Sequence, residues 1–304
     1  MKTIQKISVI IPFHNEKENL PVLIESLQAS LQKNNITNEI ILVDDGSLDN
    51  YGSSIQHYVD TGFVILLKLN RQMGKGKALA EGIAKSSGDT ILFMDADLQD
   101  NPENIPAFIN KIESGYDFVN GVRHTRKDNL IIKLYSSIAS WFLRTYLHSP
   151  FSDINCGFKM FRKIVLKDVV LYGNNFRFLP LAVFYEGYRV SEIPVQNKPR
   201  IYGKSKYGIG KVFVGGIDMI SAYFLYKFAE KPLHFFGGIG AILLGIGGLA
   251  LAWVTYERLF LGVLLYQRPA LQYAIFLIIL GIQIIMTGII GELIVYLHQK
   301  RNHN

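Results

Sequence analysis

The sequence predicts an α/β fold, in which a mostly parallel sheet domain is followed by amphipathic helices and a two-helix transmembrane hairpin. Short apolar runs alternate with helical patterns in the first part of the chain, and each run ends in a polar or glycine-rich loop. Strands that alternate with helices form parallel sheets, and the loops at their carboxyl ends meet at one edge. Two long uncharged segments later in the chain predict the hairpin.

Composition narrows the class of protein. The 304 residues allow one full α/β domain plus a smaller part, and 49% of them are hydrophobic. This is high for a soluble enzyme, so we expect part of the chain to lie in lipid. The net charge of +7 favours anionic lipid heads or phosphorylated substrates as partners, and the sequence lacks the dense Lys/Arg run of a nucleic-acid site. The single cysteine, Cys156, fits a reducing compartment.

Four apolar runs predict the first strands of the sheet. They are Ile7–Ile11, which Pro12 closes, Glu39–Val43, Phe63–Leu67 and Ile91–Met94. Helices are expected over Lys17–Gln32 and from the segment Asn70–Ala78 onward. The N-terminus lacks the apolar core of a signal peptide, so we expect the sheet domain to stay in the cytoplasm.

The middle of the chain predicts further elements of the same domain. A helix starts at Asn101–Glu103, with proline near its first turn. Strands are expected at Tyr116–Asn120 and Glu192–Val195. Leu130–Leu147 has apolar residues at helical spacing, which suits either a core helix or an interfacial helix on the membrane.

Two carboxylates, Asp95 and Asp97, follow the fourth predicted strand. Side chains at i and i+2 share a face while the chain stays extended, so both are placed to reach one hard cation. Mg²⁺ or Mn²⁺ is commonly held by one or two carboxylates together with substrate phosphates. Most such pairs are solvated acids in a loop. The surrounding loops therefore decide whether Asp95 and Asp97 form a metal site or an ordinary solvated turn.

Basic groups follow other predicted strands. Lys75 and Lys77 alternate with glycines, which suits a phosphate cradle or an ordinary turn. Arg123 and Arg126 follow the strand at Tyr116–Asn120, either as a solvated face or as phosphate ligands. The loop at 199–208 combines cations, a hydroxyl and glycines that suit a diphosphate: Arg200, Lys204, Ser205 and Lys206.

Several motifs together resemble the inverting family-two glycosyltransferases of the GT-A fold. They are V-I-I-P-F-H-N-E, L-V-D-D-G-S-L-D, N-R-Q-M-G-K-G-K-A and D-A-D-L-Q-D-N-P. The resemblance implies contacts to the base and ribose of a nucleotide from Pro12, Asn15, Glu16, Asp44 and Asp45. It also implies that Asp95 and Asp97 serve a divalent metal and the diphosphate, and that Gln99 lines the sugar pocket.

A second signature narrows the resemblance to polyprenyl-phosphate sugar transferases. Ser152–Arg162 reads S-D-I-N-C-G-F-K-M-F-R and is similar to dolichyl-phosphate glucose and mannose synthases and their bacterial relatives. Asp153 matches the acidic position near the reacting centre, whereas Cys156 is interpreted as a small packing residue. In this family the R-x-x-G-x-S-K loop closes over the nucleotide sugar.

The hairpin is predicted from two runs of 22 residues without Asp, Glu, Lys or Arg, at 235–256 and 270–291. We expect a catalytic domain over 1–208, a juxtamembrane amphipathic helix within 209–234 and the hairpin within 235–298. Gly237, Ala241 and Gly245 form a small-residue face, which either pairs the two helices or builds an oligomer.

The expected activity is inverting transfer of a hexose from UDP-glucose or GDP-mannose to a polyprenyl phosphate at the cytosolic face of the plasma membrane. A phosphate acceptor is mostly ionised at neutral pH, so a strong general base is not required. We expect Arg123 and Arg126 to position it, Asp153 to orient it, and Mg²⁺ or Mn²⁺ to assist. The resemblance also implies a homo-oligomer, such as a tetramer.

Two other functions compete with this interpretation. A processive polysaccharide synthase is disfavoured because neither tryptophan, Trp141 or Trp253, follows the Gln-x-x-Arg of its acceptor motif. A catalytically silent membrane module that binds a partner such as a flippase is disfavoured by the intact D-x-D pair and basic loop.

Overall fold

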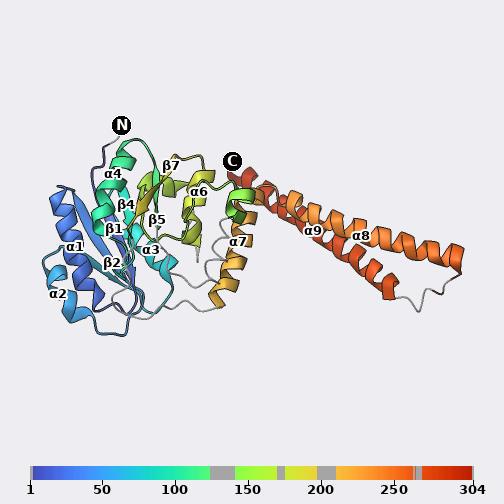
Figure 1. The fold of residues 1–304 in the computed structure, drawn as a ribbon, viewed down its shortest axis with the longest axis horizontal. Coiled ribbons are helices and arrows are strands. Elements are labelled where there is room, and N and C mark those ends of the chain that lie inside the picture. Colours follow the sequence, from blue (N-terminus) through green and yellow to red (C-terminus); the bar gives the residue numbers. More distant parts are fainter. Residues whose placement is uncertain are drawn as a thin grey trace. The chain divides into compact units, whose positions relative to one another are not determined.

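The computed structural model describes residues 3–123, 141–169, 175–196, 210–262, 264 and 269–302. It divides into two compact units, Met1–Met219 and Ile220–Asn304 (Figure 1).

The first unit is built on a seven-stranded sheet with the strand order β3-β2-β1-β4-β6-β5-β7 (Figure 1). The strands are β1 (Ile7–Phe13), β2 (Asn38–Asp44), β3 (Val64–Lys68), β4 (Thr90–Phe93), β5 (Phe118–Arg123), β6 (Lys159–Arg162) and β7 (Val190–Val195). Of these, β6 alone is antiparallel to its neighbours, β4 and β5. The predicted mostly parallel sheet is therefore confirmed.

The central strand β1 is buried along its whole length, as its apolar run predicts. Pro12 lies inside this strand, opposite Val43 of β2, and does not close it. Proline lacks the amide proton of a sheet ladder, so it is normally excluded from central strands. It is accommodated here because the pairing of β1 with β4 already ends at Ile10.

Helices connect the parallel strands. They are α1 (Asn19–Lys33), α2 (Gly52–Asp60), α3 (Lys75–Lys85), α4 (Ile105–Glu113), which follows the 3₁₀ turn η1 (Pro102–Asn104), and α6 (Leu179–Tyr185). Helix α3 packs closely on β1 because Gly82 has no side chain; a Cβ at that position would lie 2.4 Å from Cγ2 of Ile10. This close packing holds α3 against the central strands β1 and β2.

Strand β6 was not predicted from the sequence. It has four residues, and charged side chains stand at both of its ends, Lys159 and Arg162. Its conformation depends on pairing with β4 and β5 rather than on a local pattern. The predicted helix Leu130–Leu147 is described only from Trp141, where residues 141–147 are helical and bury Leu143 and Leu147.

The second unit contains two long helices, α8 (Pro232–Leu261) and α9 (Pro269–Asn302), which lie side by side as a hairpin (Figure 1). Helix α7 (Gly210–Phe228) precedes them and contributes residues to both units. Both long helices are apolar enough to cross a membrane, and only 11% and 17% of their most apolar windows are buried. A core helix of a soluble protein is mostly buried, so these helices form a candidate membrane hairpin.

The two helices approach each other at glycines other than the predicted ones. A Cβ at Gly240 would lie 2.5 Å from Cγ1 of Ile285, and one at Gly281 would lie 2.9 Å from the carbonyl oxygen of Gly240. At Gly245 a Cβ would have nothing within 4 Å in the described residues. Of the two roles predicted for the face of Gly237, Ala241 and Gly245, pairing α8 with α9 is therefore wrong, because that face points away from α9.

Replacing Gly247 by alanine is expected to weaken the hairpin. The new methyl would lie 2.9 Å from Cγ1 of Ile278 and 3.0 Å from the carbonyl oxygen of Ala274. Overpacking of this kind costs about 1–3 kcal/mol, which an unfolding titration in detergent micelles measures. The matched control is Gly245→Ala, which adds the same methyl in open space. An equal loss of stability in both variants would refute the assigned contact.

Candidate active site

One edge of the sheet gathers most of the charged groups singled out above. The parallel strands end there with Phe13, Asp44, Phe93, Arg123 and Val195. Because β6 is antiparallel, its first residue, Lys159, lies at the same edge, opposite Phe93 of β4 and Asn120 of β5. Acids from β2 and β4 thus share an edge with cations from β5 and β6.

The two acids at the end of β2 are buried and hold the neighbouring loops. Asp44 accepts hydrogen bonds from the amide of Ser47 and the hydroxyl of Tyr51, both at 2.7 Å. Asp45 accepts from the amides of Met73 (2.7 Å) and Gly74 (3.0 Å). The β2–α2 and β3–α3 loops are therefore fixed by the carboxylates that the resemblance assigns to the nucleotide.

The loop after β1 is tied to the same region. Asn15 has a φ of 58°, a left-handed conformation that asparagine tolerates better than most residues. Its side-chain oxygen accepts from the amide of Leu48 at 2.8 Å, and its amide donates to Oγ of Ser47 at 3.0 Å. The carbonyl of Glu16 accepts from the amides of Asn19 and Leu20, at the start of α1. The structure thus brings the predicted nucleotide residues of β1 and β2 together.

The two carboxylates after β4 do not lie on an extended segment. Strand β4 ends at Phe93. Ala96 and Asp97 then form a turn, and Leu98 after it has a φ of 61°. The prediction of an extended segment is therefore wrong, and the turn sets the directions of Asp95 and Asp97. Non-glycine residues with positive φ cluster at functional sites.

Three acids crowd this turn. Asp100 accepts from the amide of Asp95 at 3.3 Å, and Asp97 accepts from the amide of Gln99 at 3.2 Å. Burial raises the pKa of Asp100 to about 7, and the charges of Asp95 and Asp97 act in the same direction. Three carboxylates therefore lie within one short turn, and two of them disfavour ionisation of the third.

Lys75, at the start of α3, forms an ion pair with Asp95. Desolvation raises the pKa of Asp95, but the charge and hydrogen bond of Lys75, together with the charges of Arg123 and Lys159, hold this pKa below its usual value. Lys77, the other cation of the predicted cradle, instead pairs with Glu81 one turn along the helix. Of the two lysines, Lys75 is thus the one that belongs to the site.

Arg123 and Asp153 form a bidentate ion pair. Nε of Arg123 donates to Oδ2 of Asp153 at 2.8 Å, and Nη2 donates to Oδ1 at 3.2 Å. Burial lowers the pKa of Arg123, but Asp153 outweighs it and raises this pKa overall, so the guanidinium stays charged. The pair joins the end of β5 to the loop at 152–157, which precedes β6.

Three polar side chains hold that loop, the buried Lys159 and Asn120 and the half-buried Glu192, and the sequence analysis assigned a role to none of them. Nζ of Lys159 donates to the carbonyl of Ile154 at 2.9 Å and to Oδ1 of Asn120 at 2.8 Å. Nδ2 of Asn120 donates to the carbonyl of Asp153 at 2.8 Å. Glu192 accepts from the amide of Ser152 at 2.9 Å and from its hydroxyl at 2.6 Å. Strands β5, β6 and β7 together therefore set the position of Asp153.

Lys159 is 3% exposed, and burial lowers its pKa to about 8. A signal for it was present in the sequence. A lone lysine between Phe158 and Met160-Phe161 interrupts an apolar run, and a charge in such a run is seldom buried without a partner. The partners, however, come from β5 and from a loop, which no local pattern identifies.

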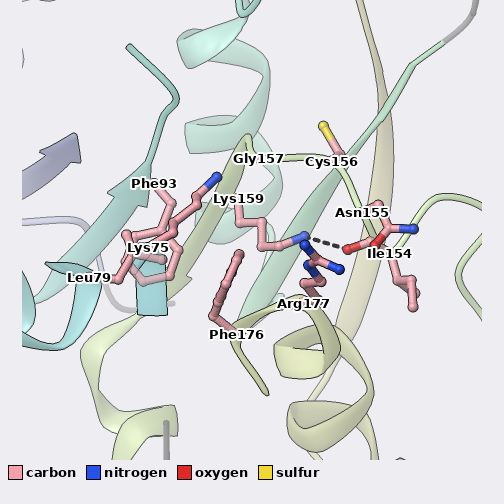
Figure 2. Close-up of a pocket in the computed structure, with 10 residues that line it drawn as sticks. All are labelled: Lys75, Leu79, Phe93, Ile154, Asn155, Cys156, Gly157, Lys159, Phe176 and Arg177. Atoms are coloured by element: carbon pink, nitrogen blue, oxygen red, sulfur yellow. Dashed lines mark hydrogen bonds between the residues drawn. The ribbon is translucent and has the colours of Figure 1, made fainter. Parts of the chain in front are cut away.

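A pocket opens beside this network (Figure 2). Its lining residues come from α3, β4, the 152–157 loop, β6 and the 3₁₀ turn η3 (Asn175–Phe178): Lys75, Leu79, Phe93, Ile154, Asn155, Cys156, Gly157, Lys159, Phe176 and Arg177. Of the charged residues singled out from the sequence that the structure describes, only Lys75 of the possible phosphate cradle lines it. Asp95 adjoins it through Lys75 and Gly157.

Gly157 allows Asp95 to approach the loop. A Cβ at this position would lie 2.5 Å from Oδ2 and 2.7 Å from Cγ of Asp95. Replacing Gly157 by alanine is therefore expected to displace that carboxylate and to lower the enzyme's turnover about tenfold to a hundredfold. Initial rates and a melting curve measure this change. A substitution in open space on a distant turn, Gly187→Ser, is not a suitable control, because Gly187 has a positive φ that disfavours any side chain.

A better control is Gly52→Ala, at the first residue of α2, where a Cβ has nothing within 4 Å among the described residues. We expect its turnover to match that of the native protein. Unchanged turnover in Gly157→Ala, with the fold intact, would show that the position of Asp95 does not matter.

Five of the predicted site residues lie outside the described residues: Arg126, Arg200, Lys204, Ser205 and Lys206. Among the described residues, no group of three or more His, Cys, Asp or Glu side chains is arranged to hold a metal ion.

Comparison with known proteins gives consistent results. Residues 8–170 match the family described as Glycosyl transferase family 2. A dodecaprenyl-phosphate galacturonate synthase from Rhizobium johnstonii is 33% identical over 298 residues, covering 95% of this chain and 87% of the relative. An undecaprenyl-phosphate 4-deoxy-4-formamido-L-arabinose transferase from Serratia proteamaculans is 30% identical, covering 97% and 90%.

Solved structures share the fold. A glucosyl-3-phosphoglycerate synthase from Mycobacterium tuberculosis, in complex with Mn²⁺ and UDP-glucose, has a TM-score of 0.55 and 18% identity over 72% of this chain and 79% of that chain. A mannosyl-3-phosphoglycerate synthase from Rubrobacter xylanophilus has a TM-score of 0.57 and 15% identity, covering 72% and 74%. The expected GT-A fold is confirmed.

Proposed function

The chain belongs to glycosyl transferase family 2, as a glycosyltransferase that acts on polyprenyl phosphate, and from this premise we propose that it transfers a hexose with inversion from a nucleotide-diphosphate sugar. The observation that carries the proposal is the acidic turn after β4, which lies beside a cationic pocket at the carboxyl edge of the sheet. This arrangement suits a metal-bound diphosphate on one side and an anionic acceptor on the other.

Asp95 and Asp97 are the residues that would hold a divalent cation, Mg²⁺ or Mn²⁺. The clustering of carboxylates at this turn supports this, because the charges of Asp95 and Asp97 add to burial in raising the pKa of Asp100. Two carboxylates plus diphosphate oxygens form a common donor set for these ions. When bound, the cation offsets charge that develops on the leaving diphosphate.

The donor's nucleotide would lie over the ends of β1 and β2. The ordered loops there carry Pro12, Asn15, Glu16, Asp44 and Asp45, and Gln99 would contact the sugar. The loop residues Arg200, Lys204, Ser205 and Lys206 would close over the diphosphate. UDP-glucose and GDP-mannose remain candidate donors, while two relatives are named for galacturonate and for 4-deoxy-4-formamido-L-arabinose.

The acceptor would attack as an anion. A phosphate monoester has a second pKa of about 6, so it is mostly a dianion at neutral pH and needs no strong general base. It needs cations that hold it next to the donor, and Arg123 and Arg126 are candidates. Asp153 would act by orienting Arg123, to which it is bonded through two oxygens.

The hairpin α8–α9 would place the enzyme at the plasma membrane, as a multi-pass protein with its catalytic domain in the cytoplasm. A lipid-borne acceptor is only available at a bilayer, which agrees with this location. The small-residue face of α8 that does not contact α9 would be available to other subunits of a homo-oligomer.

A donor screen tests the proposal. Purified full-length protein is mixed with undecaprenyl phosphate, Mn²⁺ and one radiolabelled donor: UDP-glucose, GDP-mannose, or nucleotide-activated galacturonate or 4-deoxy-4-formamido-L-arabinose. One donor is expected to give a labelled product in the organic phase that is lost when the metal is chelated. A catalytically silent module that binds a partner would give no product with any donor. The relatives named as a synthase and a transferase make this alternative the less favoured one.

A further inference from the structure

The pocket in Figure 2 is lined by three cations and by no carboxylate among its described residues. Lys75 comes from α3, Lys159 from β6 and Arg177 from η3. Lys75 is paired with Asp95, but within the described part of the chain Lys159 has no carboxylate at ion-pair distance. The pocket therefore carries a net positive charge.

Lys159 is only partly satisfied by its neighbours. An ammonium group has three donors. The side chain uses two of them, on a carbonyl and an amide oxygen, and no third acceptor lies within hydrogen-bond distance in the described residues. Burial of a charge that meets only neutral acceptors is unfavourable because the charge loses its hydration. A bound anion would offset this desolvation energy.

Arg177 brings a second charge to the same pocket. Its guanidinium lies 3.9 Å from Asp218, which is longer than a hydrogen bond, and it lies over the ring of Phe176 at 6.0 Å. Its side chain remains about one-third exposed (32%). The planar fork of an arginine can bind two oxygens of one phosphate, so this side chain suits a phosphate ligand.

We propose that Lys159 and Arg177 bind the phosphate head of the polyprenyl acceptor in this pocket. The inference rests on the proposed function and deepens it. It names Lys159, to which the sequence analysis gave no role within the signature Ser152–Arg162, and Arg177, which lies outside the motifs. Arg123, the acceptor ligand expected from the sequence, is already held by Asp153 and does not line the pocket.

The strand order explains why the acceptor, rather than the donor, belongs here. The nucleotide residues lie at the ends of β1 and β2, and the acidic turn follows β4, the next strand along. Lys159 lies one strand further, on β6, and the loop with Asn155 leads into that strand. An acceptor that attacks from the side opposite the leaving diphosphate must approach from this direction.

The step is balanced without another reactant. One phosphate oxygen of the acceptor dianion forms a bond to the anomeric carbon, while the bond from that carbon to the diphosphate oxygen breaks. The electron pair of the broken bond leaves with the nucleoside diphosphate, and no proton needs to move. Lys159 and Arg177 would orient the attacking phosphate and screen its repulsion from the diphosphate.

The test is Arg177→Gln in the full-length enzyme, because this side chain is partly exposed and its loss leaves the core intact. We expect the KM for undecaprenyl phosphate to rise about tenfold to a hundredfold, as for a lost charge-assisted hydrogen bond. The KM for the donor sugar should not change. Binding of farnesyl phosphate, followed in micelles by ³¹P NMR, should weaken by the same factor, and farnesol, which lacks the phosphate, should not displace it from the native enzyme.

Arg177→Lys, which keeps the charge, should recover part of the acceptor affinity. Arg189→Gln is the matched control, because Arg189 precedes β7 at the opposite end of the sheet and contacts the ring of Tyr116.

Lys159→Gln should raise the acceptor KM as Arg177→Gln does. A melting curve shows whether this variant is folded.

The outcomes separate the possibilities. Weaker nucleoside-diphosphate binding with an unchanged acceptor KM would assign the pocket to the donor and overturn the inference, as would no change in either. If the native enzyme bound farnesyl phosphate through Arg177 but made no glycolipid with any donor, the pocket would stand and the proposed function would fail.

Discussion

Replacing Asp95 and Asp97 together by asparagine is expected to lower the rate of sugar transfer by at least about 10³-fold, because a bound metal contributes several kcal/mol of charge stabilisation. Asparagine keeps the size and one oxygen of each side chain but removes the charge that would hold the proposed cation. The measurement is the initial rate of labelled glycolipid formation with the donor found in the screen. Mn²⁺ binding in the presence of nucleoside diphosphate, followed by electron paramagnetic resonance, should be lost in parallel.

The control for this variant is Asp60→Asn, on the exposed end of α2, where the carboxylate accepts only a local bond from Gln56 in the described structure. We expect its rate and Mn²⁺ binding to match the native enzyme. If the double variant still made glycolipid at the native rate, the acidic turn would not be the catalytic centre.

The first half of the sheet could be predicted because each strand carries its own signal. The strands β1, β2, β3 and β4 are apolar runs that end in polar loops, and the structure moves their ends by only one or two residues. The position of Asp95 and Asp97 at the end of β4 follows from the same pattern. The turn at Ala96 and Asp97 does not, because no local pattern marks the left-handed conformation of Leu98 that follows it.

The cationic part of the site could not be predicted, because it depends on where strand β6 lies in the sheet. Strand β6 lies between β4 and β5 and runs against them, which brings Lys159 beside Asn120, 39 residues earlier in the chain. The pairing of Lys75 with Asp95 likewise joins α3 to the turn after β4. Such contacts are set by the order of the strands, and no local pattern records that order.

The hairpin also shows that a local pattern predicts an element but not its contacts. The uncharged runs located both spans, and the helices extend beyond them to Pro232 and Asn302. Which face of α8 meets α9 is decided by small residues on both helices at once, so a pattern read on α8 alone selected the wrong glycines.

Replacing Asp153 by alanine is expected to destabilise the catalytic domain by about 3–5 kcal/mol, because it leaves the charge of Arg123 largely buried without its partner. Side-chain exposures of 17% for Arg123 and 13% for Asp153 show that little water is available to replace the lost carboxylate. Thermal or denaturant unfolding of the full-length protein measures the loss. Sugar transfer should fall by about 10²-fold or more, since the loop at 152–157 loses one of its anchors.

A double variant separates stability from catalysis. Arg123→Met with Asp153→Leu removes both charges, and such apolar replacements of buried ion pairs are often neutral or stabilising. If the pair serves only the fold, this variant should recover both stability and sugar transfer. If Arg123 and Asp153 also position the acceptor, stability should return while transfer stays low and the acceptor KM stays high. We expect the second result, because the pair joins β5 to the loop that lines the cationic pocket.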